Sequence, residues 1–432
     1  MIRGEIPAGW KRATIGEIAE FRRGFSWKKE AERHEAGDGR VPVLRIPNIQ
    51  DRLRLDDLLY VQVEGSRDLR RFGAGKGWSL LVGSNGNPKR VGNCVYIDRD
   101  SDFLFASFLL AAGPIDGNEV VGEYLFRLLA SDPVQRSITE NVQGSTGLKN
   151  IRLESLKQVE VLVPPLKEQR KIAAILSSID DSIAATNGVL NQLIFFKDQI
   201  IGEFTARGLP GHHAQFKPTE IGEIPKAWRL IPLSEIAEVK GGKRMPKGHR
   251  FASFKTEFPY IRVSDFEDGT VRQDRLEYVL PGDRESIKSY TISKDDLYIS
   301  IAGTLGLIGE IPKILDGAQL TENAAKICKI KGTVDRLFLM FALQGQRSQG
   351  QVMKLKGVGG GVPKLALFRI ESIRIALPPI DEQREITDVL LAAVSRIRSE
   401  RSYLERLKIL KAALLSVLLS GEVQTKFGSV PA

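Results

Sequence analysis

The same four motifs occur twice in this sequence and in the same order, and this duplication limits the possible folds more than any other feature. The paired segments are EIPAGW at 5–10 with EIPKAW at 223–228, GEIAE at 16–20 with SEIAE at 234–238, PVLRI at 42–46 with PYIRV at 259–263, and PPLKEQR at 164–170 with PPIDEQR at 378–384. The members of each pair lie 214 to 218 residues apart. Such a period is far longer than the roughly 20 to 50 residues of solenoid repeats. We therefore expect a pseudo-dimer within one chain, with an approximate two-fold relation between its halves.

The first part of each half has the pattern of a mixed α/β domain. Short apolar runs bounded by turn residues, such as 77–82 and 296–301, predict strands. One helix is expected near 124–142 in the first half and one near 337–355 in the second. The predicted fold class is therefore α/β, with two globular domains in tandem at residues 1–164 and 222–378. The pattern leaves their strand order open.

A long helix is predicted to follow each domain, over residues 165–208 and 379–421. The Pro-Pro pair of each PP[LI]xEQR motif suits a first helical turn, because proline lacks the amide donor that this turn leaves unpaired. No further proline occurs before Gly208 or Gly421, which suit the C-terminal ends. Helices of about 40 residues would be about 60 Å long. Residues 209–221 then form a linker and residues 422–432 a tail.

Apolar residues recur every 3.5 residues along both predicted helices, which is the pattern of a coiled coil. The predicted seam consists of Ile172, Leu176, Ile179, Ile183, Leu190, Leu193, Ile386, Leu390, Ile397, Leu404, Leu407, Leu414 and Leu418. Polar residues interrupt it at equivalent places, Thr186 with Glu400 and Lys197 with Lys411. Because a single such helix would expose a long apolar stripe, we expect an antiparallel coiled coil with Ile172 near Leu418. Two amphipathic helices in separate domains are the alternative.

Sequence motifs of the common enzyme classes were not found. There is no phosphate-binding GxxxxGK[ST], no HExxH, no GxSxG and no Asn/Asp-Pro-Pro-aromatic quartet of an amino-methyltransferase. We therefore expect a non-catalytic chain with no metal or cofactor of its own. The two cysteines, Cys94 and Cys328, cannot form a disulfide framework and suit the reducing cytoplasm. The longest apolar run, 103–112, is about half a membrane span, so no membrane association is expected.

Basic residues suggest an anionic partner, since Lys and Arg outnumber Asp and Glu by 63 to 53. They gather beside glycines and aromatic residues at equivalent places in both halves, as expected for contact with DNA phosphates. The candidate DNA-binding residues are Arg22, Arg23, Lys28, Arg45, Lys89, Arg90, Lys149, Lys243, Arg244, Lys247, Arg262, Lys356 and Lys364. Lys356 and Lys364 flank the glycine-rich segment 357–361. For Arg45 and Arg262, which lie in apolar runs, a structural ion pair is as well supported as a base contact.

Two variable globules that each end in PP[LI]xEQR and a long helix resemble the specificity subunit of type I restriction-modification systems. The resemblance covers nearly the whole chain. It implies that each globule is a target recognition domain for one half of a split double-stranded DNA site, and that the helices fix the gap. It also implies two methyltransferase subunits as partners, which carry S-adenosylmethionine, and ATP- and Mg-dependent restriction subunits. Part of the methyltransferase contact is expected at Gln169, Arg170, Gln383 and Arg384.

Two other functions compete with this one. A tethering scaffold could use the coiled coil to bind proteins, and its DNA binding would then be independent of sequence. An enzyme with an unrecognised site, such as a nuclease or methyltransferase, would show activity as an isolated chain with magnesium or S-adenosylmethionine.

Overall fold

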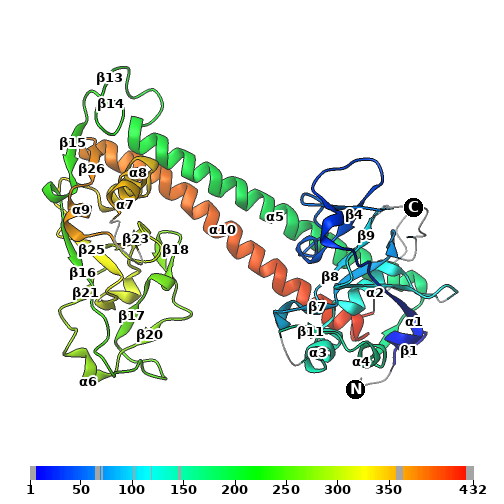
Figure 1. The fold of residues 1–432 in the computed structure, drawn as a ribbon. Coiled ribbons are helices and arrows are strands. Elements are labelled where there is room, and N and C mark those ends of the chain that lie inside the picture. Colours follow the sequence, from blue (N-terminus) through cyan, green and yellow to red (C-terminus); the bar gives the residue numbers. More distant parts are fainter. Residues whose placement is uncertain are drawn as a thin grey trace, which may run out of the picture. The chain divides into compact units, whose positions relative to one another are not determined.

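The computed structural model describes residues 6–63, 69, 72–100, 103–117, 119–144, 147–356 and 363–424. It divides into two compact units, Met1–Asn187 with Tyr403–Ala432 as unit 1, and Gly188–Ser402 as unit 2. The two long helices are α5 (Leu166–Arg207) and α10 (Ile380–Leu419) (Figure 1). Each of them has one end in unit 1 and the other end in unit 2. Among the described residues, no helix has the length and apolar character needed to cross a membrane.

Unit 1 contains the first α/β domain. Its four-stranded antiparallel sheet has the order β2-β10-β6-β8, and a mixed sheet has the order β3-β5-β4-β9. The strands are β1 (Lys11–Thr14), β2 (Ala19–Arg23), β3 (Glu32–Arg33), β4 (Arg40–Leu44), β5 (Leu59–Gln62), β6 (Ser79–Val82), β7 (Ser84–Asn85), β8 (Cys94–Tyr96), β9 (Leu104–Phe105), β10 (Leu109–Pro114), β11 (Lys149–Asn150) and β12 (Glu160–Val163). The helices are α1 (Ile15–Ile18), α2 (Gly122–Leu129), α3 (Asp132–Glu140) and α4 (Leu153–Lys157).

Unit 2 repeats this arrangement. Its sheets have the orders β16-β25-β22-β23 and β20-β17-β24-β21. The parallel pair β17 with β24 is equivalent to the parallel pair β4 with β9 of the first domain. The strands are β13 (Phe216–Lys217), β14 (Ile224–Pro225), β15 (Arg229–Pro232), β16 (Glu238–Gly241), β17 (Pro259–Ile261), β18 (Phe266–Glu267), β19 (Thr270–Val271), β20 (Glu277–Tyr278), β21 (Thr291–Ile292), β22 (Leu297–Ser300), β23 (Ile308–Glu310), β24 (Ala318–Leu320), β25 (Ala324–Cys328) and β26 (Arg374–Leu377). The helices are α6 (Pro281–Arg284), α7 (Arg336–Gln344), α8 (Gln346–Leu355) and α9 (Leu367–Glu371).

The single helix expected in each domain is wrong, because each forms two helices. In the first domain the break falls between α2 and α3, where Pro133 in the first turn of α3 cannot continue a preceding helix. In the second domain Gly345 separates α7 from α8 with an extended backbone conformation. The predicted linker also contains structure, since β13 pairs with β14 as a short hairpin.

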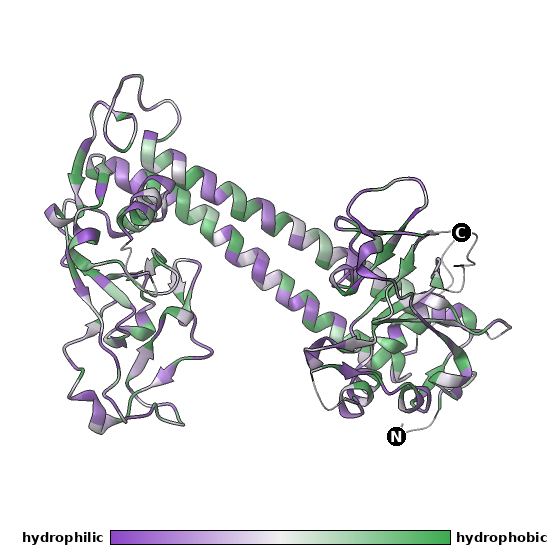
Figure 2. Ribbon diagram, in the orientation of Figure 1, coloured by the Kyte–Doolittle hydropathy of each residue, from purple (hydrophilic) through white to green (hydrophobic). Residues whose placement is uncertain are grey.

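The two long helices pack antiparallel, as the heptad pattern predicted. In unit 1, Ile172 and Leu176 from the start of α5 share a hydrophobic cluster with Leu418 from the end of α10. In unit 2, Ile200 from the end of α5 shares a cluster with Ile386 from the start of α10. Figure 2 shows hydrophobic residues alternating with hydrophilic ones along both helices, as expected for a seam with a solvated outer face.

Most of the predicted seam is buried. Nine of its residues are at most 8% exposed: Ile172, Leu176, Leu190, Ile386, Leu390, Ile397, Leu404, Leu407 and Leu418. Ile179, Ile183, Leu193 and Leu414 are partly buried. Thr186 is accommodated in the seam because its hydroxyl donates to the carbonyl oxygen of Ser182, one turn earlier, at 2.8 Å.

Candidate nucleic-acid interface

The repeated EIPxxW and PP[LI]xEQR motifs join each globular domain to the helix that follows it. The indole Nε1 of Trp10 donates to Oε2 of Glu168 at 3.0 Å, and Trp228 donates to Oε2 of Glu382 at the same distance. Two antiparallel strand pairs, β1 with β12 and β15 with β26, close each domain beside this contact. The spacing of these motifs thus reflects a structural joint that occurs once in each unit.

The glutamine of each PP[LI]xEQR motif completes the joint. Gln169 accepts from the amide of Val121 at 2.8 Å and donates to the carbonyl oxygens of Glu119 and Pro164. Gln383 makes the same three kinds of contact, with Asp335, Thr333 and Pro378.

Both glutamines are fully buried, so their expected role in contacting a methyltransferase is wrong. Sequence reasoning missed this because a glutamine near a helix start is usually solvated. Arg170 and Arg384 are exposed.

Strand pairing brings two predicted basic loops of the first domain together. β7 pairs with β11, which places Asn85 opposite Lys149, and the loop that begins at Asn85 carries Lys89 and Arg90. Gly86 approaches the carbonyl oxygen of Gly147 so closely that an added Cβ would lie 3.3 Å from it. The second domain has the equivalent contact in a bridge between Ala302 and Lys364. Residues 145–146 and the glycine-rich segment 357–361 lie outside the described residues.

The basic segment around Phe25 begins within strand β2, which contains Arg22 and Arg23. Arg22 lies over the ring of Trp78, 4.0 Å from its centroid, and pairs with Glu20 at 2.9 Å. In the second domain, Lys243 lies 5.4 Å from the ring centroid of Tyr290.

Glycine is required directly after strands β2 and β16, because another part of the backbone passes close by at both places. A Cβ on Gly24 would lie 2.1 Å from the carbonyl oxygen of Ala106, and a Cβ on Gly242 would lie 2.1 Å from that of Thr321.

Besides Arg22 and Arg262, four candidate residues make local polar contacts. Arg244 pairs with Glu322 at 2.5 Å. Burial raises the pKa of the Glu322 carboxyl, but hydrogen bonds from Arg244, from the backbone and from Thr321 outweigh this effect, so the pKa is lowered. Arg90 donates to the carbonyl oxygen of Ile49 at 3.0 Å, and Lys149 donates to that of Gly144 at 2.6 Å. Arg45 lies 3.4 Å from Asp57.

Arg262 is the most fully engaged basic residue. Its guanidinium makes hydrogen bonds to both carboxylate oxygens of Asp265, to Glu277 and to the carbonyl oxygen of Arg275. The carboxylate of Asp265 also accepts from the backbone amide of Arg262 at 2.8 Å. Together with the Arg45–Asp57 pair, this network favours the structural alternative for the two strand arginines.

The remaining candidates are available for a ligand. Within the described part of the chain they are exposed and make no side-chain ion pair or hydrogen bond: Arg23, Lys28, Lys89, Lys247, Lys356 and Lys364. No group of three or more His, Cys, Asp or Glu residues in the described ranges could hold a metal ion.

Each domain also contacts its own long helix through a turn that sequence reasoning missed. In unit 1, Arg52 lies 2.8 Å from Asp181 of α5. In unit 2 the charges are exchanged, because the domain supplies the carboxylate of Asp268 and α10 supplies the guanidinium of Arg401. The Asp268-Gly269 dipeptide has positive φ at both residues and joins β18 to β19. Such a dipeptide is a recognisable hairpin signal, so the turn itself could have been predicted.

Comparison with known proteins gives a consistent result. A family model described as "Type I restriction modification DNA specificity domain" matches residues 7–194 and 225–408. The type I restriction enzyme MjaIX specificity subunit of Methanocaldococcus jannaschii is 24% identical over 98% of this chain and 95% of its own length. The EcoKI specificity subunit of Escherichia coli is 21% identical over 99% and 92%. A crystal structure of the S subunit from M. genitalium has a TM-score of 0.54, with 16% identity and coverage of 97% and 98%.

Proposed function

The chain belongs to the type I restriction-modification DNA specificity family, and on this basis we propose that each of its globular domains reads one half of a bipartite DNA site. DNA sequence recognition is the role of such a subunit, and the chain is a non-catalytic component of the complex. The family match favours this role over the tethering scaffold. The two recognition domains would occupy residues 1–164 and 222–378, and the helix pair would fix the unread spacer between the half-sites.

The observation that carries this proposal is the duplicated joint. Trp10 with Glu168 and Trp228 with Glu382 tie equivalent domains to opposite members of an antiparallel helix pair. Two equivalent reading domains in one chain suit a DNA site whose two parts are read separately. Half-sites read from one face of a duplex lie about 34 Å apart, or a multiple of this distance. Helices of 42 and 40 residues are about 60 Å long, which is enough to support such a separation.

Exposed lysines would supply the affinity for DNA that does not depend on sequence. Lys28 and Lys89 in the first domain, and Lys247, Lys356 and Lys364 in the second, are free to neutralise phosphates. Arg23 is the candidate for a base contact, since its guanidinium can form paired hydrogen bonds with guanine. Arg45 and Arg262 would instead stabilise the backbone that follows strands β4 and β17 through their ion pairs.

Exposed apolar residues on the long helices support a contact with two copies of a methyltransferase subunit. Phe195 and Phe196 of α5 are 68% and 56% exposed, and Ile409 and Leu410 of α10 are 69% and 47% exposed. The two pairs lie 214 residues apart and are therefore equivalent in the repeat. We call them the α5 patch and the α10 patch. Two equivalent patches suit two copies of one partner.

The partners would carry the chemistry of the complex. S-adenosylmethionine would bind to the two methyltransferase subunits, and ATP with Mg to the restriction subunits, in line with the missing enzyme motifs of this chain.

The experiment that tests this function is co-expression with a methyltransferase subunit, followed by mapping of methylated adenines across a genome. We expect one bipartite motif with a fixed spacer. Replacing residues 222–378 by the equivalent domain of another family member should then change one half of the motif and leave the other unchanged. Methylation without a sequence motif, or a change in both halves, would contradict the proposal.

A further inference from the structure

Asp180 of α5 links Lys411 of α10 to the first domain. Its Nζ lies 2.6 Å from Oδ1 of Asp180 on α5. The other oxygen, Oδ2, accepts from the guanidinium of Arg127, which belongs to α2 of the first domain. A single carboxylate therefore holds three elements that are far apart in the sequence.

This network lies inside unit 1. Arg127 is only 3% exposed, and the side chain of Asp180 is 23% exposed. Burial raises the pKa of Asp180, but the hydrogen bonds and charges of Lys411 and Arg127 outweigh it, so that the pKa is lowered. Asp180 is thus held in its charged form, and Glu123 adds a second acidic neighbour 3.6 Å from Arg127.

Unit 2 contains the same lysine without the network. Lys197 is the equivalent of Lys411, 214 residues earlier, and its Nζ lies 3.1 Å from Asp198 of its own helix. The same offset replaces Arg127 by Phe341 and Asp180 by Val394.

Matching contacts support this offset. Gln135 donates to the carbonyl oxygens of Gly92 and Leu129, and Gln349 donates to those of Gly306 and Leu343.

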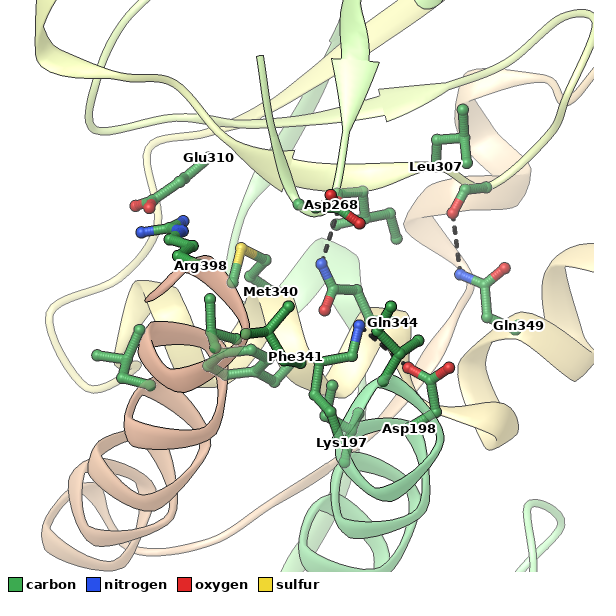
Figure 3. Close-up of a pocket in the computed structure, with 18 of the residues that line it drawn as sticks. Lys197, Asp198, Asp268, Leu307, Glu310, Met340, Phe341, Gln344, Gln349 and Arg398 are labelled. Carbon is green, nitrogen blue, oxygen red and sulfur yellow. Dashed lines mark hydrogen bonds and ion pairs between the residues drawn. The ribbon is translucent and has the colours of Figure 1, made fainter. Parts of the chain in front are cut away.

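The space that the network would fill in unit 2 is a cavity of about 500 Å³. It is lined by Phe341, Val394 and Lys197, and also by Leu391, Ile397 and Met340. Figure 3 shows Lys197 and Asp198 joined on α5 beside the side chain of Phe341. At these equivalent positions, an ionic network links α2 to the helix pair in unit 1. In unit 2 the same place is a partly open, largely apolar space, whose lining also includes the paired Asp268 and Arg401.

We infer that Lys411, Asp180 and Arg127 are positioning residues that fix the first domain on the helix pair and thereby set the spacer length, whereas Lys197 has no such role. This inference rests on the proposed function. A slip of one helical turn, about 5.4 Å, corresponds to between one and two base pairs of about 3.4 Å, so a small change in register alters the spacer. A polar contact within an apolar seam is a known way to fix register.

The test uses the full chain in complex with its methyltransferase partner. The substrates are duplexes that carry both half-sites with spacers from two base pairs shorter to two base pairs longer than the preferred one. For K411M, we expect methylation on the neighbouring spacers to rise about tenfold relative to the preferred spacer, because the variant removes one partner of a partly buried ion pair whose carboxylate also holds the buried Arg127. The matched control K197M removes an equivalent lysine and should keep the wild-type spacer profile. Half-site preference should be unchanged in both variants.

Two further variants keep the test decisive if K411M folds poorly. K411R retains the charge and should restore the wild-type spacer profile, whereas D180E keeps the charge but displaces it by one methylene and should shift the profile. A folded K411M or D180E with the wild-type profile, or a K197M that changes it equally, would overturn the inference. If the wild-type complex shows no spacer preference, the proposed function itself fails, and the inference fails with it.

Discussion

The indole nitrogen of Trp10 lies 3.0 Å from a carboxylate oxygen of Glu168, although the two residues are 158 positions apart. The contact joins the beginning of the first domain to the first turn of α5. Because Trp228 and Glu382 repeat it in unit 2, the most recognisable motifs of the sequence are structural joints and not DNA-binding elements.

Replacing Trp10 by Phe should destabilise unit 1. The substitution removes a donor to the buried carboxylate of Glu168, and hydrogen bonds to charged groups contribute about 1.5–3 kcal/mol. The control is W27F, since Trp27 makes a bond of the same length to Glu32 in a partly exposed site. Chemical denaturation should show the larger loss for W10F, and equal losses would contradict the buried joint.

The glutamine of the second PP[LI]xEQR motif should matter more than the arginine beside it. Q383L replaces a fully buried amide side chain and leaves the partly buried backbone amide of Asp335 without its acceptor, and we expect a loss of about 2–3 kcal/mol in the free energy of unfolding. R384A changes an exposed side chain and should stay within about 0.5 kcal/mol. A larger effect of R384A in thermal or denaturant unfolding would contradict this assignment.

Asp180 should make the stability of unit 1 depend on pH. Its pKa is below the ordinary value of 3.8, so its stabilising effect is complete above that value and is lost as the pH falls through the lower folded-state pKa. The wild type should therefore exceed D180N in unfolding free energy by a constant amount from about pH 7 to pH 5, and this difference should shrink below about pH 4. A difference that persists unchanged at low pH would exclude Asp180 as its source.

The exposed lysines should govern the salt dependence of DNA binding. K89A is expected to weaken binding about equally for all sequences and to reduce the slope of log affinity against log salt by about 0.9. R262A should instead lower the stability of the second domain, because it removes four hydrogen bonds of the guanidinium. Titrations of labelled duplexes at several salt concentrations separate the two effects, and an unchanged slope for K89A would remove it from the interface.

The α5 and α10 patches should each hold one methyltransferase subunit. The double variant F195S/F196S is expected to lower the stoichiometry of the complex from two copies to one, and I409S/L410S should have the same effect through the other patch. Native mass spectrometry measures the copy number directly. V389S removes an exposed valine outside both patches and serves as the control. Retention of both copies in the two double variants would show that the contact lies elsewhere.

The duplication and the antiparallel helix pair could be predicted because both leave regular patterns in the sequence. Motif order reveals the first, and the 3.5-residue period of residues such as Ile172 and Leu418 reveals the second. The strand order could not be predicted, since strands of two to six residues carry no partner information.

The burial of Gln169 and Gln383 could not be predicted either, because their partners are backbone groups. The difference between Lys411 and Lys197 was accessible, however, because the offset of 214 already aligns Asp180 with Val394.

The division of each long helix between the two units has a consequence for biosynthesis. Unit 1 takes residues from both ends of the chain, whereas unit 2 is formed from one continuous stretch. On the ribosome, Ile172 and Leu176 emerge long before Leu418, their partner in the cluster, has been translated. Unit 2 can therefore complete its fold before unit 1, and the apolar residues of the first half that pack against Leu418 stay uncovered until the end of α10 has been translated.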